Sequence, residues 1–599
     1  AAALALALAA CSRGEGGAAG KAAGYNVLLV TLDTTRADHL GCYGRASAET
    51  PALDGLAARG VLWEHALSTA PLTTPAHASL LTGLYPPTHG VRNNGSAPLD
   101  AVHPTLAGLL RERGYATGAF ISAFVLERRY GLDRGFEVYD DAIEPTTAAA
   151  AFGSRDSRSA RAVTDAALGW LEKQGPERPF LLWVHYYDPH EPYQPPPPFD
   201  ERFRDRPYDG EIAYVDSQLA RLFSALDARR LAQRTLVAVA GDHGESLGEH
   251  GEAAHARLVY EGAMRVPLIL ACPGVLPAGE RVGDRVVSIA DLAPSVLELL
   301  GLEPPRACEG KSLFGPAEEG RAVYLETLLP YYNHGWAPLY ALRTREAKYI
   351  LAPRRELYDL ASDPAEAVNL YGRDPRSQEL ERRLDELLRR WGPDALPQAD
   401  DRVRDPEEVS KLAALGYSGS VSPDGSLGVL DPKDMIASWH AVLGAKRLAG
   451  EARGPTAAAK LDEAVRILEG VLERSPRDRS ALQQLARVQL QRHRNDLARE
   501  ALERYIAIQP SADACVFLAQ LLIADGRTEE AEARLALAEE LEPRHGGIFI
   551  ARGELFARQR RWKEAEAAYE TALEVDPARA RGMAGAGLEE ARARLARER

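Results

Sequence analysis

Short apolar runs alternate with amphipathic stretches over the first half of the chain, and this alternation limits the folds that the chain can adopt. Residues 26–32, 179–188 and 235–241 are rich in Val and Leu and have the length of buried strands. Residues 164–175 and 209–229 have the spacing of amphipathic helices. Strands and helices in this order predict an α/β domain with a largely parallel, doubly wound sheet.

An internal repeat organises the C-terminal part of the chain. Four prolines follow one another at intervals of 33 or 34 residues, and each lies twelve residues after an alanine. The prolines are Pro476, Pro510, Pro543 and Pro577, and the alanines are Ala464, Ala498, Ala531 and Ala565. This period is that of tetratricopeptide repeats, in which each unit is a pair of helices. We expect an all-α solenoid that binds a protein or peptide partner in its concave groove, with a generic helical bundle as the alternative.

The charge of the chain bears on its partners. The 599 residues carry a formal net charge of −14, which argues against nucleic acid as a partner. An ordinary proportion of apolar residues, 45%, leaves ample material for a soluble globular core.

The first residues have the pattern of a secretion signal. Residues 1–11 (AAALALALAAC) are apolar and end in small residues before Cys11, which resembles a bacterial lipobox whose cysteine is lipidated. The run is too short to span a bilayer. We expect residues 1–24 to be a truncated lipoprotein signal peptide and a flexible tether, with an Ala-rich disordered start as the alternative. A lipid on Cys11 would anchor the protein to a membrane outside the cytoplasm, in the periplasm or at the cell surface.

A threonine near the expected start of a helix is the central candidate for chemistry. In residues 70–83 (APLTTPAHASLLTG), Thr73 lies just ahead of Pro75, and proline is well tolerated at the first position of a helix. The free N–H groups and the dipole of a helix N-terminus favour a phosphate or sulfate group there. The simpler alternative is that Thr73 or Thr74 only caps the helix.

Two predicted strands end in potential metal ligands. Asp33 follows the first strand, and Asp242 and His243 follow the strand at 235–241. Because the carboxyl ends of parallel strands meet at one edge of a sheet, we expect these side chains to lie close to Thr73. Two carboxylates, an imidazole and a hydroxyl predict a site for one divalent cation, Ca²⁺, Mn²⁺, Mg²⁺ or Zn²⁺. Such an ion would activate Thr73 as a nucleophile on phosphorus or sulfur.

Further polar residues are candidates for contacts with the substrate. They are His77, Asn93, His190 and His255, and the three histidines are also candidates for catalysis. The alternative for each of them is a surface or structural role.

Several stretches of the chain, in order, match one enzyme family. They are VTLDTTRADHLGCYG, APLTTPAHASLLTGLYPPTHG, HYYDPHEPY, GDHGESLGEHG with YEGAMRVPLIL, and ELYDLASDPAEAVNL. Through them residues 25–375 resemble the sulfatase family of the alkaline phosphatase superfamily. The resemblance implies a mixed, mostly parallel sheet between helices, a bound divalent cation, and hydrolysis or transfer at a sulfate or phosphate ester of a glycan, a lipid head group or a small molecule. It implies a nucleophile at Thr73 and metal ligands at Asp33, Asp242 and His243.

The chain departs from this family at several positions. Sulfatases carry Cys or Ser at the nucleophile position and convert it to formylglycine, and Thr73 cannot be converted. The other replaced positions are Thr34, where the family has Asp, His77 for Arg, His255 for Lys, and Ser122 and Phe124 in place of the Lys and His of one further segment. Because superfamily members with a threonine nucleophile act on phosphate esters, we favour a phosphate ester. A true sulfuric ester hydrolase and a catalytically inactive, anion-binding scaffold are the alternatives.

The sequence thus predicts four parts. They are the signal and tether at 1–24, a catalytic domain at 25–375, a connector at 376–432 and a repeat domain at 433–599.

Overall fold

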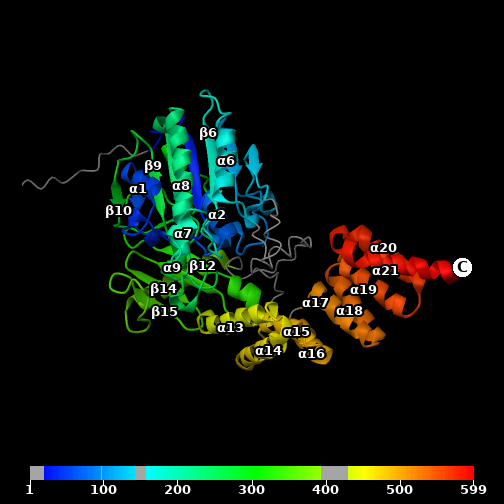
Figure 1. The fold of residues 1–599 in the computed structure, drawn as a ribbon. Helices are drawn as coiled ribbons and strands as arrows, with labels where there is room; N and C mark the ends of the chain where they lie inside the picture. The colour runs from blue at the N-terminus through cyan, green and yellow to red at the C-terminus, as the bar shows by residue number, and fades with distance from the viewer. Residues whose placement is uncertain (1–18, 96, 144–156, 393–429, 509, 599) are drawn as a thin grey trace, which may run out of the picture. The chain divides into compact units, whose positions relative to one another are not determined.

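The computed structural model describes residues 19–598, apart from 96, 144–156, 393–429 and 509 (Figure 1). Cys11, the expected lipidation site, lies outside the described residues, and so does most of the expected connector. The chain divides into two compact units. Unit 1 comprises residues up to 327 together with 339–396, and unit 2 comprises 328–338 and 397–599. The domain limits expected from the sequence stay a prediction.

Unit 1 is built on an eight-stranded mixed sheet in the order β10-β2-β9-β7-β1-β6-β4-β5. Strand β1 lies between β6 and β7 and is parallel to both, whereas β9 is antiparallel to β7 and β2. The strands are β1 (Asn26–Leu32), β2 (Val61–Trp63), β4 (Ala116–Phe120), β5 (Val138–Asp140), β6 (Phe180–Tyr186), β7 (Thr235–Gly241), β9 (Leu268–Ala271) and β10 (Glu280–Val282). The mostly parallel α/β sheet expected from the sequence is confirmed.

Helices cover both faces of this sheet. Alternate residues of β1, namely Leu28, Val30 and Leu32, pack in one apolar core with α1 (Pro51–Ala58), α6 (Ala160–Leu171) and the 22-residue helix α8 (Pro207–Ala228), which Figure 1 shows along the sheet. Thr31 points to the opposite face, where it contacts His77 of α2 (Thr73–Thr82). Because side chains alternate along a strand, polar residues of the central strands such as Thr31 lie on the face of the sheet that packs against α2.

Smaller elements complete unit 1. A three-stranded sheet has the order β11-β3-β8, and a four-stranded antiparallel sheet has the order β12-β13-β14-β15. Their strands are β3 (Ala66–Leu67), β8 (Arg265–Val266), β11 (Val287–Ser288), β12 (Val323–Thr327), β13 (Leu339–Arg343), β14 (Ala347–Leu351) and β15 (Glu356–Asp359). The remaining helices are α3 (Pro86–His89), α4 (Leu106–Glu112), α7 (Phe199–Arg202), α9 (Glu261–Met264), α10 (Leu292–Leu299) and α11 (Arg376–Trp391).

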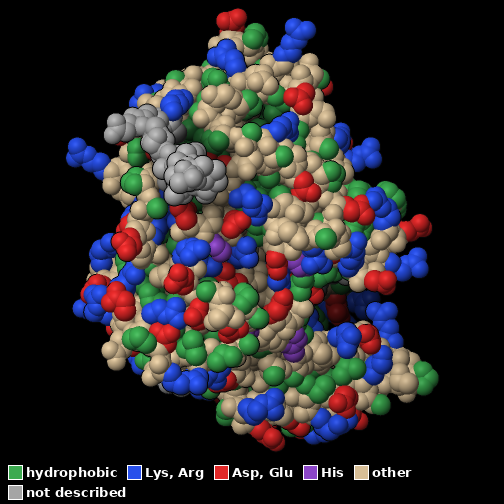
Figure 2. Space-filling view, turned by 90° about the vertical axis from the view of Figure 1, so that its left-hand side faces the viewer, with side chains coloured by type: hydrophobic (Ala, Val, Ile, Leu, Met, Phe, Trp, Pro, Cys, Tyr) green, Lys and Arg blue, Asp and Glu red, His purple; other side chains and the backbone are tan. Residues whose placement is uncertain are grey.

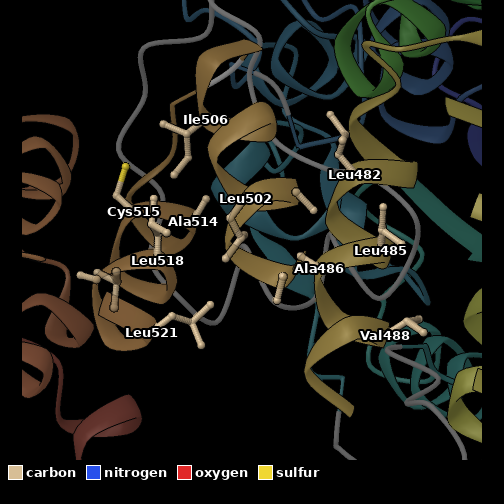
Figure 3. Close-up of a cluster of buried hydrophobic side chains, with 14 of the residues drawn as sticks. Leu482, Leu485, Ala486, Val488, Leu502, Ile506, Ala514, Cys515, Leu518 and Leu521 are labelled. Atoms are coloured by element: carbon tan, nitrogen blue, oxygen red, sulfur yellow. The ribbon is translucent and has the colours of Figure 1, made fainter. Parts of the chain in front are cut away.

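Unit 2 is a run of paired helices, as the repeat predicts. The helices are α13 (Pro432–Gly450), α14 (Ala457–Arg474), α15 (Arg479–Gln491), α16 (Asn495–Ile508), α17 (Ala512–Ala524), α18 (Thr528–Leu541), α19 (Gly546–Arg558), α20 (Trp562–Val575) and α21 (Pro577–Glu598). Figure 3 shows part of their shared apolar core, with side chains from α15, α16 and α17. All four repeat alanines are fully buried, because the paired helices approach closely at small residues.

One face of the surface carries charged side chains of both signs. On the face shown in Figure 2, Lys and Arg side chains are interspersed with Asp and Glu. Among the described residues, none of the helices combines the length and the apolar character needed to cross a bilayer.

Candidate active site and metal centre

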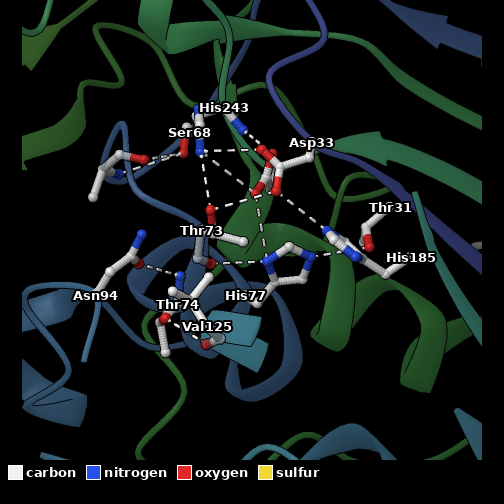
Figure 4. Close-up of polar contacts among 12 residues, drawn as sticks. Thr31, Asp33, Ser68, Thr73, Thr74, His77, Asn94, Val125, His185 and His243 are labelled. Atoms are coloured by element: carbon white, nitrogen blue, oxygen red, sulfur yellow. Dashed lines mark hydrogen bonds and ion pairs between the residues drawn. The ribbon is translucent and has the colours of Figure 1, made fainter. Parts of the chain in front are cut away.

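Thr73 is the first residue of α2 and faces the ends of the central strands (Figure 4). Its hydroxyl oxygen lies 3.4 Å from Asp33 Oδ2 and 3.4 Å from His243 Nε2. Leu72 occupies the N-cap position and its own side chain makes no capping hydrogen bond, so the capping role weighed for Thr73 is not observed. The helix begins two residues before Pro75 rather than at it, so Thr73 is at the helix N-terminus.

The two aspartates meet because their strands are neighbours. Leu32 pairs with Gly241 in the parallel ladder of β1 and β7, so Asp33 and Asp242 leave the sheet side by side. Both are fully buried. Among the described residues, no hydrogen-bond partner reaches Asp33 Oδ1 or Asp242 Oδ2.

The electrostatics of this pair fit a cation. Burial raises the pKa of Asp33, and burial together with the nearby charge of Asp33 raises the pKa of Asp242 well above its usual value. Two neighbouring buried carboxylates are unfavourable when both are ionised. A divalent ion would compensate their charge and use the oxygen atoms that accept no hydrogen bond. The residues present therefore fit the divalent cation that the fold family implies.

His243 has the form of a metal ligand. Its Nδ1 donates to the carbonyl oxygen of Gly244 at 3.0 Å, which leaves Nε2 facing Asp33 Oδ1 at 3.6 Å. Burial lowers the pKa of His243 to about 3, so the ring is neutral at neutral pH. Asp33, Asp242 and His243 each bring one ligand atom within 4.8 Å of the others, and Thr73 adds a hydroxyl.

Two of the expected histidines stand beside this group. The ring of His255 lies with its centroid 4.6 Å from that of His243, and the ring of His190 lies 5.0 Å from His255. His255 is almost fully buried, whereas His190 is partly exposed and stacks on Tyr187 at 4.3 Å. The two rings therefore lie between the candidate metal ligand His243 and the surface.

His77 lies beneath Thr73 in the protein interior. Its Nδ1 donates to the carbonyl oxygen of Thr73 at 2.8 Å, and its Nε2 lies 2.9 Å from Thr31 Oγ1. The same Nδ1 is 3.5 Å from Asp242 Oδ2. His77 thus contacts both the backbone of Thr73 and the side chain of Asp242, at a position where it is fully buried.

Three residues of the site were not among those expected. Asn94, rather than Asn93, accepts the N–H of Thr74 at 2.8 Å. Glu245 holds His255, with Oε1 2.9 Å from Nδ1. His185 of β6 places Nε2 3.4 Å from Asp33 Oδ2. Glu245 and His185 belong to motifs quoted above, and Asn94 follows another of them by four residues, but the motifs alone do not indicate which side chains point inward. Asn93 stays a prediction as a substrate contact.

Family profiles cover most of unit 1 and part of unit 2. Residues 25–302 match the profile "Sulfatase", and residues 248–392 match "N-sulphoglucosamine sulphohydrolase, C-terminal". Residues 456–514 match "Tetratricopeptide repeat".

Individual relatives agree with the profiles. An uncharacterized sulfatase of Escherichia coli K12 is 26% identical over 454 residues, which cover 64% of this chain and 88% of the relative. An arylsulfatase of Clostridium perfringens is 23% identical and covers 60% of this chain and 92% of the relative. The phosphonate monoester hydrolase structure from Agrobacterium radiobacter shares the fold, with a TM-score of 0.53 and 24% identity over 62% of this chain and 96% of that one. Through residues 25–392 the chain therefore belongs to the sulfatase family of ester hydrolases, and tetratricopeptide repeats follow this domain.

Proposed function

We propose that this protein is a metal-dependent hydrolase, or a transferase, that cleaves a phosphate ester through Thr73. The carrying observation is the position of the Thr73 hydroxyl, 3.4 Å from both a carboxylate and an imidazole at a helix N-terminus. A threonine cannot become formylglycine, so the nucleophile is a simple alcohol. Water can cleave a phosphate ester formed on the threonine oxygen. A phosphate ester is therefore a better substrate for this nucleophile than a sulfate ester.

In the first step Thr73 Oγ1 forms a bond to phosphorus while the bond to the leaving oxygen breaks. The proton of Thr73 passes through His255 or His190 to the leaving alcohol. In the second step water attacks the same phosphorus, the bond to Thr73 Oγ1 breaks, a proton from the water returns to Thr73 Oγ1, and phosphate leaves. The helix N-terminus at Thr73 and nearby side chains, Asn93 or Asn94 among them, stabilise the charged oxygens.

Asp33, Asp242, His243 and Thr73 would hold the divalent cation. When bound, this ion lowers the pKa of the Thr73 hydroxyl and stabilises negative charge on the ester oxygens. His77 keeps the Thr73 backbone in place through its hydrogen bond to the carbonyl oxygen.

A sulfate ester is the second candidate substrate. The curated relatives named above include an arylsulfatase, and a further relative, 27% identical over 61% of this chain, is an ulvan-active sulfatase of Formosa agariphila. In this alternative the unmodified Thr73 attacks sulfur. An inactive, anion-binding scaffold is the third candidate.

The remaining proposals concern location and partner. The lipobox-like pattern before Cys11 supports a lipid-anchored protein outside the cytoplasm. The paired helices of unit 2 support docking of a protein or peptide, as in other repeat arrays.

A substrate panel tests the function. The full chain is assayed with aryl sulfate, phosphomonoester, phosphodiester and phosphonate in the presence of Mn²⁺, Zn²⁺, Mg²⁺ or Ca²⁺, and the acid-quenched protein is analysed by mass spectrometry. We expect faster cleavage of phosphate esters and a phosphoryl group on Thr73. Much faster cleavage of aryl sulfate would support the second candidate, and the absence of turnover with every metal would support the scaffold.

A further inference from the structure

His185 carries a buried nitrogen atom aimed at the aspartates. It lies in β6, next to β1, and its side chain is fully buried. Among the described residues, its Nε2 has no hydrogen-bond partner, and it points toward Asp33 Oδ2 at 3.4 Å. A buried polar atom without a partner is rare in a native protein and points to a bound ligand or a functional role.

His185 and His77 belong to one cluster with Asp242. Each of the three offers a ligand atom, and these atoms lie within 4.8 Å of one another. The rings of His77 and His185 contact edge to face, with centroids 5.0 Å apart. Asp242 contributes to this group and also to the group of Asp33 and His243 described above. Within the described residues these are the two groups of this kind.

Both rings are held by hydroxyl groups on the side away from Asp242. Ser122 Oγ donates to the carbonyl oxygen of His185 at 2.8 Å and lies 3.1 Å from His185 Nδ1, which the Ser122 N–H also approaches at 3.4 Å. In the tautomer that donates from Nδ1 to Ser122 Oγ, Nε2 has a free lone pair for an ion. Thr31 Oγ1 lies 2.9 Å from His77 Nε2 and can accept its proton. Histidines that bind metals are held in this way, with one nitrogen on the ion and the other on a neighbouring acceptor.

We propose that His77, His185 and Asp242 hold a second divalent cation, beside the one assigned to Asp33, Asp242, His243 and Thr73. The inference deepens the proposed function and rests on it for the first ion. His77 Nδ1 would exchange its hydrogen bond to the Thr73 carbonyl oxygen for the ion. The sequence predicts one ion, and the second position depends on a β6 residue that it did not single out.

The donor set indicates the class of ion. Two imidazole nitrogens and one carboxylate suit Zn²⁺, Mn²⁺, Co²⁺ or Fe²⁺ better than Ca²⁺ or Mg²⁺. One dication balances the charges of Asp33 and Asp242, so a second one leaves the site with net positive charge. Such a site attracts the anionic ester that the proposed reaction requires.

Metal counting tests this second site. The full chain is stripped with a chelator, reloaded with Mn²⁺ alone, and analysed by mass spectrometry for metal content and by electron paramagnetic resonance. We expect two ions per chain and the spectrum of a coupled Mn²⁺ pair, because the ions share the Asp242 carboxylate. One ion per chain, or the spectrum of isolated Mn²⁺, would overturn the proposal whatever the variants do.

Substitutions then locate the second ion. His185→Asn keeps an amide near the position of Nδ1 for Ser122 but removes Nε2, and we expect it to bind one ion with an uncoupled spectrum. His103→Gln, a change in a loop outside both clusters, is the matched control and should bind two. Two coupled ions in His185→Asn would contradict the proposal. Thr73→Ala separates the covalent mechanism from the second metal site. Activity in this variant would contradict the proposed function, whereas a count of two ions per chain would still support the second site.

Discussion

Glu245 Oε1 lies 2.9 Å from Nδ1 of His255, and both side chains are buried next to the candidate metal ligand His243. The contact fixes the His255 ring, so that its other nitrogen is turned away from Glu245. The ring of His243 is its neighbour, at 4.6 Å between centroids. Glu245 is therefore a positioning residue for His255.

Removing the Glu245 carboxylate is expected to lower kcat more than it changes KM. Glu245→Ala frees the His255 ring, and we expect a loss of about 10- to 100-fold, as for other residues that orient a ligand or catalytic histidine. Glu245→Gln keeps an acceptor oxygen and should retain most of the activity. Steady-state kinetics on a phosphate ester with a poor leaving group measures the effect. Equal losses in the Ala and Gln variants would contradict a positioning role.

Replacing the nucleophile separates chemistry from folding. Thr73→Ala removes the hydroxyl that faces Asp33 and His243, and we expect kcat to fall by roughly 10³-fold or more. Thr73→Ser keeps a hydroxyl at the same place and should lose far less. Circular dichroism and thermal unfolding check that both variants fold. Activity in Thr73→Ala equal to that of the unaltered protein would refute the covalent mechanism.

The sequence predicts that the candidate metal ligands lie close together, and the reason is simple geometry. Asp33, Asp242 and His243 follow apolar runs, and parallel neighbouring strands bring such ends together. Thr73 could be placed at a helix start from local signals, although the helix begins at Thr73 itself and not at Pro75. The repeat alanines are buried as their period predicts.

Other features depend on contacts that a single sequence does not encode locally. His185 faces inward because β6 pairs in register with β1, where it stands opposite Thr31. An apolar run such as that of β6 gives no alternation from which this could be read. In the same way, the apolar strand β9 has a sequence like those of the parallel strands β1 and β7, and only its pairing with β7 and β2 shows that it is antiparallel.

Removing divalent cations is expected to destabilise unit 1. Without a cation, the buried carboxylates of Asp33 and Asp242 face each other, and each resists ionisation. At a metal concentration 100 times the Kd, binding stabilises the folded state by about 2.7 kcal/mol. We expect a chelator to lower the Tm measured by calorimetry. Asp242→Asn removes one of the two charges, so the chelator should affect it less; an equal drop in Tm would contradict the electrostatic explanation.

Acid is expected to destabilise the protein partly through His89. Its Nδ1 accepts the N–H of Val91 at 3.1 Å, its Nε2 lies 3.0 Å from Ser79 Oγ, and burial lowers its pKa to about 3. The folded pKa is below the unfolded value of about 6.5, so the stabilisation is complete above pH 6.5 and is lost as pH falls toward 3. His89→Asn can still accept from Val91 but does not titrate. Urea unfolding between pH 7 and 4 should show a shallower loss in this variant; an unchanged slope would exclude His89 as a contributor.

The close approach of the repeat helices can be tested at one alanine. Ala531 in α18 is fully buried, and a larger side chain there must push apart helices that pack at this point. We expect Ala531→Leu to lower the free energy of unfolding by about 1–3 kcal/mol, the usual cost of overpacking a core. Ala533→Leu, at an exposed position of the same helix, is the matched control and should change stability little. Chemical denaturation followed by circular dichroism measures both, and similar effects of the two substitutions would show that α18 does not pack through the repeat alanine.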